Sequence, residues 1–191
     1  MRLFIAAEVG EDIRERCAEM MESLKGSGAD IRTVSPENLH ITLKFLGDVR
    51  EDDVKKISDT LRELCEGSEP FTTSFSTLGY FGSPRFPRTI WVGISEGREA
   101  ISGLATELNE RLSWVNREER KPRPHLTLAR VKSPVNSERL VETIQSLRDV
   151  KLGETHVKEL KLKRSILRPD GPLYSDLEAF GLGKAGVSEG V

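Results

Sequence analysis

The stretch Leu39-His40-Ile41-Thr42-Leu43 returns later in the chain as Pro124-His125-Leu126-Thr127-Leu128. Both copies contain His-x-Thr-Leu, follow a proline-containing turn or loop, and precede a segment with helical periodicity. Two of the three histidines of the chain occupy the same position in these copies. One such tetrapeptide arises readily by chance, whereas two copies in matched settings indicate an internal repeat that organises the fold.

Each copy predicts a β-strand, because apolar and polar residues alternate and strand-forming types are frequent. Successive side chains of a strand point to opposite faces, so His40 and Thr42 share one face, as do His125 and Thr127. If the two halves pack about an approximate two-fold axis, both pairs face one cleft. A phosphate bound there would meet two imidazoles and two hydroxyl donors.

This set of side chains suits acid–base cleavage of a phosphodiester. A neutral histidine can take a proton from water while a protonated one supplies a proton to the leaving oxygen, since the reference pKa of histidine is about 6.5. Such catalysis contributes roughly 10²–10⁴-fold in rate. The threonine hydroxyls would hold the phosphate in line. No carboxylate cluster with metal-ligand spacing lies near the motifs, so we expect neither a metal nor another cofactor.

Each motif alone has a plainer explanation, because a lone histidine on a strand is commonly packed or solvated and threonine is a good strand former. His156 has no matching motif, and we expect it at the surface. Three classes of protein remain open: an enzyme, a nucleotide- or RNA-end-binding module without chemistry, and a structural protein with coincidental motifs. Binding alone does not require two proton-transfer groups, so the pair favours the enzyme.

The order of the remaining elements predicts an α+β fold with two mainly antiparallel sheets flanked by helices. Residues 1–181 would form one domain of two interleaved lobes related by a pseudo-two-fold axis, and residues 182–191 a flexible C-terminal tail. Strands are expected over 3–9, 31–34, 39–46, 71–78, 89–94, 126–131, 157–167 and 173–180, and helices over 11–24, 51–64, 101–112 and 135–147. Loops are expected over 79–88 and 118–124, and a turn over 169–172.

Composition limits the partners of the chain. Its 191 residues are 37% hydrophobic and 31% charged, and 29 Lys plus Arg against 31 Asp plus Glu give a net charge of −2. This balance argues against a protein that coats nucleic acid, although a small basic site remains compatible with it. Cys17 and Cys65 lack a paired spacing and are expected as buried, reduced thiols. The apolar run Leu3–Ala7 is too short for a signal peptide or membrane span, so we expect a cytoplasmic protein without a membrane partner, and by default a monomer.

At its two motifs the chain resembles the two-histidine (2H) phosphoesterase superfamily, whose hallmark is a pair of His-x-Thr/Ser-x motifs. Within it, the chain is similar to the bacterial and archaeal RNA 2′,3′-cyclic phosphodiesterases, also called 2′–5′ RNA ligases, over nearly its whole length. The segments that carry this resemblance are Arg2-Leu3-Phe4-Ile5-Ala6, residues 38–47, Ile90-Trp91-Val92-Gly93, residues 124–130, Ser165 and Gly171-Pro172-Leu173-Tyr174.

The resemblance implies a bilobal fold with a central cleft and a metal-independent hydrolase that opens 2′,3′-cyclic phosphate ends of RNA to 2′-phosphomonoesters. It implies that His40 is the proton donor to the ribose 3′-oxygen, that His125 is the proton acceptor from water, and that Thr42 and Thr127 bind the phosphate. The reverse reaction would join ends through a 2′–5′ bond. The group suggests tRNA halves as substrates, and the alternatives are a small cyclic nucleotide or 2′–5′ oligoadenylate.

Further site residues are less sharply indicated. Arg130 matches an arginine of the family and could bind phosphate through two hydrogen bonds, but strict alternation places it opposite His125 unless the strand bulges, and a surface ion pair is an equal alternative. Lys44 shares the predicted face of His40, with solvation as the alternative. Phe45 matches an aromatic residue of the family that could lie near a base, but alternation places it in the core, which we expect. One or two loop cations could attract an RNA backbone, with solvation as the expectation for most of them. The candidates are Arg85, Arg88, Arg120, Lys121 and Arg123.

Overall fold

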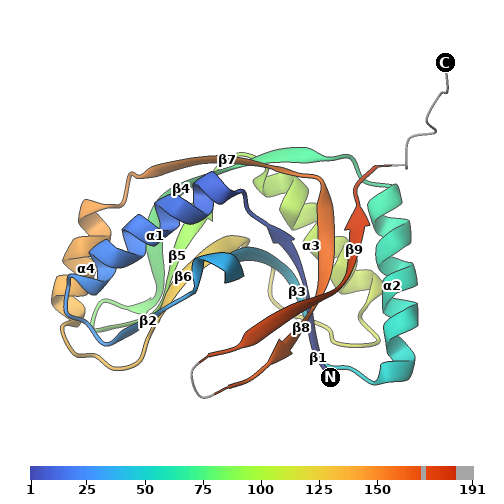
Figure 1. Ribbon diagram of the computed structural model, residues 1–191, viewed down its shortest axis with the longest axis horizontal. Helices are drawn as coiled ribbons and strands as arrows, with labels where there is room; N and C mark the ends of the chain where they lie inside the picture. The colour runs from blue at the N-terminus through green and yellow to red at the C-terminus, as the bar shows by residue number, and fades with distance from the viewer. Residues whose placement is uncertain (169–170, 184–191) are drawn as a thin grey trace.

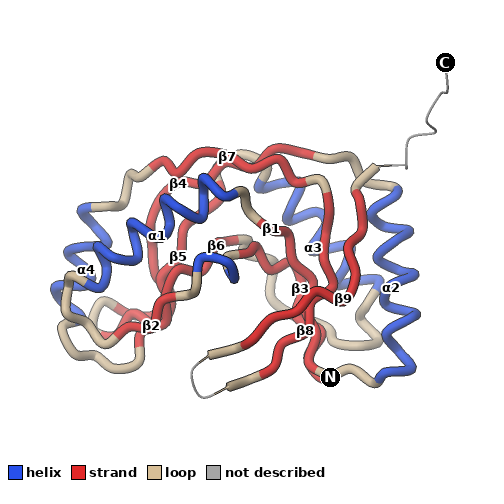
Figure 2. Tube along the Cα trace, viewed as in Figure 1, coloured by secondary structure: helices blue, strands red, loops and turns tan. Residues whose placement is uncertain are grey.

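The computed structural model describes residues 1–168 and 171–183 (Figures 1 and 2). The helices are α1 (Glu11–Lys25), α2 (Glu51–Glu66), α3 (Arg98–Arg111) and α4 (Ser137–Ser146), with a short 3₁₀ turn η1 (Pro36–Asn38). The strands are β1 (Arg2–Glu8), β2 (Ile31–Thr33), β3 (His40–Asp48), β4 (Phe71–Ser83), β5 (Phe86–Ile94), β6 (His125–Val131), β7 (Lys151–Val157), β8 (Glu159–Ile166) and β9 (Leu173–Gly181). None of the helices in these ranges is long and apolar enough to cross a membrane.

The strands form an antiparallel sheet in the order β7-β4-β5-β6-β3-β1-β8-β9, with β2 paired to β6. The predicted α+β class with antiparallel pairing is therefore confirmed. The two expected sheets are joined into one, because β3 and β6 share the single residue pair Ile41↔Leu126. These are the central residues of the two His-x-Thr motifs, so the junction of the halves lies where the repeat predicts a two-fold relation. We call the parts on either side the β3 half (β3, β1, β8, β9) and the β6 half (β6, β5, β4, β7, β2).

The halves are interleaved through their helices (Figure 1). Helix α1 follows β1 of the β3 half but packs on β7 and β6, while α3 follows β5 of the β6 half but packs on β3. Helices α2 and α4 stay with their own halves and pack on β8 and β9 and on β4 and β5, respectively. Each half is thus completed by a helix that the other half supplies.

The hydrophobic core lies between the sheet and the helices. Ile41 and Leu43 of β3 and Leu126 and Leu128 of β6 are at most 6% exposed and belong to this core. Complete burial of a leucine or isoleucine side chain contributes roughly 1.5–3 kcal/mol, so the alternate residues fix the register of both strands. The opposite face is called the motif face below, because the paired His and Thr side chains lie on it.

All four predicted helices are present, and their ends differ from the predicted ones by up to three residues. In α1, acidic residues occupy the first turn, and the buried residues Ile13, Cys17, Met20 and Leu24 recur at helical spacing before Gly26 at the C-cap. Acidic side chains near an N-terminus complement the helix dipole. Both cysteines are free and buried, and burial raises each pKa to about 12, which agrees with the expected reduced thiols.

The prediction of a loop over 79–88 is wrong, because β4 and β5 continue through these residues and form a long hairpin that turns at 84–85. The backbone of this hairpin requires glycine at position 82, because Gly82 has φ +110° and a Cβ atom there would lie 2.6 Å from the carbonyl oxygen of Phe86. Strand β7 was not predicted, because its exposed charges and Gly153 hide any alternation. His156 lies exposed on β7, as expected.

The C-terminal end of the folded body reaches slightly beyond residue 181. Leu182 is 8% exposed, and the Gly183 N–H donates a hydrogen bond to the carbonyl oxygen of Cys65 at the end of α2 (3.0 Å). The rest of the expected tail, 184–191, and Pro169-Asp170 of the expected turn lie outside the described residues.

Candidate active site

Both motif strands carry an extra residue at the same position, three residues after the histidine. Strand β1 pairs Ala6 with Thr42 and then Ile5 with Lys44, so Leu43 is passed over. Strand β5 pairs Trp91 with Thr127 and then Ile90 with Ala129, so Leu128 is passed over. A bulge of this kind reverses the alternation of the side chains that follow it, in β3 as far as a second register shift between Phe45 and Gly47.

The bulges redirect three side chains. Arg130 is exposed on the motif face beyond Thr127, where its charge lowers the pKa of His125, so the bulge that a phosphate-binding role would require is present. Phe45 is 53% exposed, and the prediction that it is a core residue is wrong. Lys44 is 1% exposed, so neither the motif-face position nor the solvated alternative holds for it.

The two imidazoles are held in the same way. Nδ1 of His40 lies 2.7 Å from the carbonyl oxygen of Asn38, and Nδ1 of His125 lies 2.6 Å from that of Arg123. A carbonyl oxygen only accepts hydrogen bonds, so each Nδ1 must carry the proton. In the neutral ring Nε2 then holds the lone pair, and neither Nε2 atom is hydrogen-bonded to a described residue. Both histidines can therefore exchange a proton through Nε2.

Aromatic rings pack against each imidazole. His40 lies 5.0 Å from the ring of Phe4 and 5.4 Å from that of Tyr174, which meets it edge-on. His125 lies 5.1 Å from Phe81, also edge-on, and 6.5 Å from Trp91. The aromatic partners come from different strands in the two halves, and the two sequence motifs did not identify these rings as neighbours of the site. The packing orients both imidazoles and shields them from water.

Burial controls the protonation of both histidines. Loss of hydration lowers the pKa of His40 from 6.5 to about 4, an effect partly opposed by the hydrogen bond to Asn38. Burial also lowers the pKa of His125, and the nearby Arg130 lowers it further. In the ligand-free protein both rings are therefore neutral at pH 7. A bound phosphate anion would raise both values, since an opposite charge favours the protonated form.

Four charged side chains, absent from the predicted site, form a ring beside His40. Glu8, which pairs with His40 in the β1–β3 ladder, accepts hydrogen bonds from Lys161 (2.9 Å) and Lys163 (2.8 Å), and both lysines also bond to Asp176. The lysines hold the pKa of each carboxyl group below its usual value, although burial opposes this. In the sequence, alternating Lys161 and Lys163 are indistinguishable from a solvated strand face, so no signal marked them.

The four motif residues are arranged diagonally about the junction of the halves. Extending the antiparallel register by one residue on either side of the pair Ile41↔Leu126 sets His40 across from position 127 and Thr42 across from position 125. Each histidine therefore has the threonine of the other motif as its cross-strand counterpart. The two imidazoles and the two threonines therefore share one face of the sheet about this junction.

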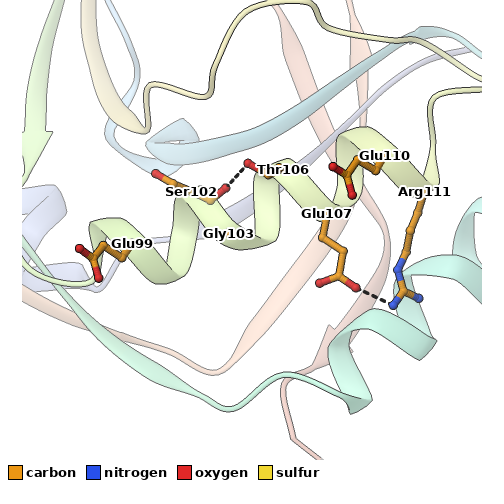
Figure 3. Close-up of a pocket in the computed structure, with 7 residues that line it drawn as sticks. All are labelled: Glu99, Ser102, Gly103, Thr106, Glu107, Glu110 and Arg111. Atoms are coloured by element: carbon orange, nitrogen blue, oxygen red, sulfur yellow. Dashed lines mark hydrogen bonds and ion pairs between the residues drawn. The ribbon is translucent and has the colours of Figure 1, made fainter.

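No group of three His, Cys, Asp or Glu side chains within the described ranges is placed to hold a metal ion. A hollow elsewhere on the surface is lined by residues of α3, namely Glu99, Ser102, Gly103, Thr106, Glu107, Glu110 and Arg111 (Figure 3). Within it, Arg111 pairs with Glu107 and Thr106 bonds to the Ser102 carbonyl oxygen. It contains none of the motif residues.

Two strand-borne histidines with free Nε2 atoms and paired threonines about a pseudo-two-fold junction define a phosphoesterase of the two-histidine class. The family model "LigT like Phosphoesterase" matches the chain twice, over residues 8–91 and 92–174, and each match contains one motif. The chain belongs to this LigT-like phosphoesterase family.

Relatives with established names agree with this assignment. The chain is 41% identical to an RNA 2′,3′-cyclic phosphodiesterase of Methanothermobacter thermautotrophicus, covering 95% of this chain and 99% of the relative. It is 37% identical to one of Archaeoglobus fulgidus, covering 94% and 99%. A crystal structure of a Thermus thermophilus protein superposes with a TM-score of 0.81 at 28% identity, covering 97% of this chain and 100% of that one.

Proposed function

We propose that the protein is an RNA 2′,3′-cyclic phosphodiesterase that opens the cyclic phosphate to a 2′-phosphomonoester. The observation that carries the proposal is the pair of imidazoles whose Nδ1 atoms are fixed by backbone carbonyls, which leaves both Nε2 atoms for proton transfer. The names of the relatives indicate the same substrate. A nucleotide-binding module would not need both rings in this tautomer.

In the proposed reaction, Nε2 of His125 takes a proton from water, and the water oxygen attacks phosphorus. The bond from phosphorus to the ribose 3′-oxygen breaks, and Nε2 of His40 gives its proton to that oxygen. The assignment of the two roles follows the family that the sequence resembles, and the lowered pKa of His125 keeps its ring neutral near pH 7, as the first role requires. His40 becomes protonated when the phosphate anion binds and raises its pKa from about 4.

Three more side chains would hold the phosphate. The hydroxyls of Thr42 and Thr127 would donate to the non-bridging oxygens, and the guanidinium of Arg130 would balance the charge that develops on them. Arg130 is exposed on the motif face and near enough to His125 to affect its pKa, which supports this role over a surface ion pair. The chain's own residues supply every proton transfer in this scheme, without a cofactor.

We further propose that the reverse reaction joins a cyclic phosphate end to a 5′-hydroxyl through a 2′–5′ bond. By analogy with the group that the sequence resembles, tRNA halves are the proposed cellular substrates, acted on by a monomer in the cytoplasm. Ligation uses the same two histidines with their roles exchanged, so each substitution that abolishes hydrolysis should abolish ligation.

The test is incubation with an oligoribonucleotide that ends in a 2′,3′-cyclic phosphate, in EDTA, followed by identification of the product. His40→Ala and His125→Ala should each lower the rate at least about a hundredfold. His156→Ala is the matched control, because this third histidine is exposed on β7 and should retain the wild-type rate. Tight binding without turnover by the folded wild-type protein would refute the enzyme and favour a binding module.

A further inference from the structure

A buried lysine anchors the loop between α3 and β6. Lys44, turned inward by the β3 bulge, donates hydrogen bonds from Nζ to Asn109 Oδ1 (2.8 Å) and to the carbonyl oxygen of Asn116 (2.7 Å). Burial lowers its pKa, and the nearby Glu118 opposes this shift. A hydrogen-bonded buried charge is costly to leave without its partners, so the lysine holds the loop firmly.

The same loop closes the free edge of β3 beyond the junction with β6. The Phe45 N–H donates to Glu118 Oε1 (3.2 Å), and its carbonyl oxygen accepts from Asn116 Nδ2 (3.0 Å). Asn109 completes the arrangement by donating to the carbonyl oxygen of Glu118 (2.8 Å) and accepting from its N–H (2.9 Å). Side chains thus replace a neighbouring strand at this edge, next to the exposed ring of Phe45.

The part of the loop that follows this anchor is basic and leads directly to the site. Arg117, Arg120, Lys121 and Arg123 are all exposed, and none of them forms an ion pair with the rest of the described chain. Glu118 is occupied by its bond to Phe45, which leaves Glu119 as the single other carboxylate from 117 to 123. The carbonyl oxygen of Arg123 fixes the ring of His125. The cations are therefore tied at one end to the His40 strand and at the other to the second histidine.

We infer that this loop, residues 117–123, binds the backbone of the RNA strand upstream of the cyclic phosphate. The inference rests on the proposed function. Unpaired cations beside an exposed aromatic ring are the combination that single-stranded nucleic acids bind without sequence preference. The chain has no overall positive charge to attract RNA, so a fixed basic loop beside the site supplies a local attraction that its composition does not.

The test compares two substrates that share the reacting group: a nucleoside 2′,3′-cyclic monophosphate, and an oligoribonucleotide of about ten nucleotides ending in the same group. The variant is Arg117→Gln/Arg120→Gln/Lys121→Gln, which keeps Arg123 in place. Each single-stranded phosphate contact contributes about 0.7 to the salt slope, so losing three should lower the slope by up to about 2 and the oligonucleotide kcat/KM up to about a hundredfold at 0.1 M salt. The ratio of kcat/KM between oligonucleotide and mononucleotide should fall accordingly, mainly through KM.

The matched control is Arg98→Gln/Arg139→Gln/Lys158→Gln, which removes the same charge from exposed positions on α3, α4 and the β7–β8 connection. It should leave the substrate ratio at its wild-type value. An unchanged ratio in the loop variant, or an equal fall in both triple variants, would overturn the inference. Equilibrium binding of an oligonucleotide with a 2′-phosphate end is measured alongside. A wild type without turnover would contradict the proposed reaction, and the salt slope of its binding, compared with that of the loop variant, would still test whether the loop binds RNA.

Discussion

The burial of His40 makes a prediction about stability as well as catalysis. Packed against Phe4 and Tyr174, this imidazole has a pKa lowered from 6.5 to about 4, chiefly because burial removes its hydration. The unfolded chain has no such packing, so there the ring protonates near pH 6.5. Substituting His40→Gln removes the titrating group while keeping a polar side chain of similar size.

The sign and size of the change in stability with pH follow from proton linkage. Between pH 6.5 and about 4 the unfolded chain binds a proton at this ring and the folded chain does not, so the free energy of unfolding falls as the pH falls through this range. At pH 5 the ring is about 1.5 pH units below its unfolded pKa, which corresponds to about 2 kcal/mol at 1.36 kcal/mol per unit. Stability contributed by the neutral ring is fully present above pH 6.5.

The assay is urea unfolding of the wild type and His40→Gln at pH 7.5 and 5.0. The wild type should lose about 2 kcal/mol more than the variant between these values. Glu8 and Asp176 have lowered pKa values and lose their stabilising charge only at more acidic pH, so they do not obscure this window. His156→Gln is the exposed control and should follow the wild type. Equal losses in the wild type and His40→Gln, or an NMR titration of His40 centred near pH 6.5, would refute the reasoning.

Three further predictions concern the site and its supports. Because both histidine pKa values are lowered in the free protein, the pH profile of kcat/KM should peak below pH 6.5. The profile of kcat reports the phosphate-bound form and should peak at higher pH. Coincident profiles would contradict this. Gly79→Ala places a Cβ atom 2.5 Å from the Trp91 ring, so it should lower kcat and lower the free energy of unfolding in urea by about 1–3 kcal/mol. The control Gly103→Ala has open space around it on α3 and should stabilise the protein by about 0.5–1 kcal/mol. Equal effects of the two substitutions would contradict the contact with Trp91. Lys44→Met should raise trypsin cleavage of the 117–123 loop roughly tenfold or more, since a lost buried hydrogen bond costs about 1–3 kcal/mol; unchanged cleavage would mean that the lysine does not hold the loop.

The motifs predicted the two strands that carry the site more completely than they predicted its surroundings. The spacing of His40 and Thr42 and its repetition at His125 and Thr127 suffice to predict two strands and a shared face, because strand alternation is a local property. The antiparallel α+β class followed from the order of elements. The merging of two sheets into one depends on a single pair, Ile41↔Leu126, which no local pattern specifies.

The positions beyond the bulges could not be read from the sequence. Alternation puts Phe45 in the core and Arg130 opposite His125, but one extra residue at Leu43 and at Leu128 reverses both assignments. A bulge is stabilised by contacts distant in the chain, such as the bonds that Lys44 makes to the α3–β6 loop. The expected loop over 79–88 failed for a related reason, since glycine and proline suggest a turn while the paired hairpin keeps both strands extended.

The exchange of α1 and α3 between the halves has a consequence for how the chain can be divided. A cut at the β4–β5 turn separates the two motifs. The first fragment keeps α1 but loses β6 and β7, the strands on which α1 packs, and it also loses α3, which covers β3. Neither fragment contains a complete layer of helix on its own strands, so neither carries an independent folding unit despite the duplicated sequence. Two copies of the chain could instead satisfy these surfaces by trading fragments. The repeat is therefore a duplicated site within an indivisible fold.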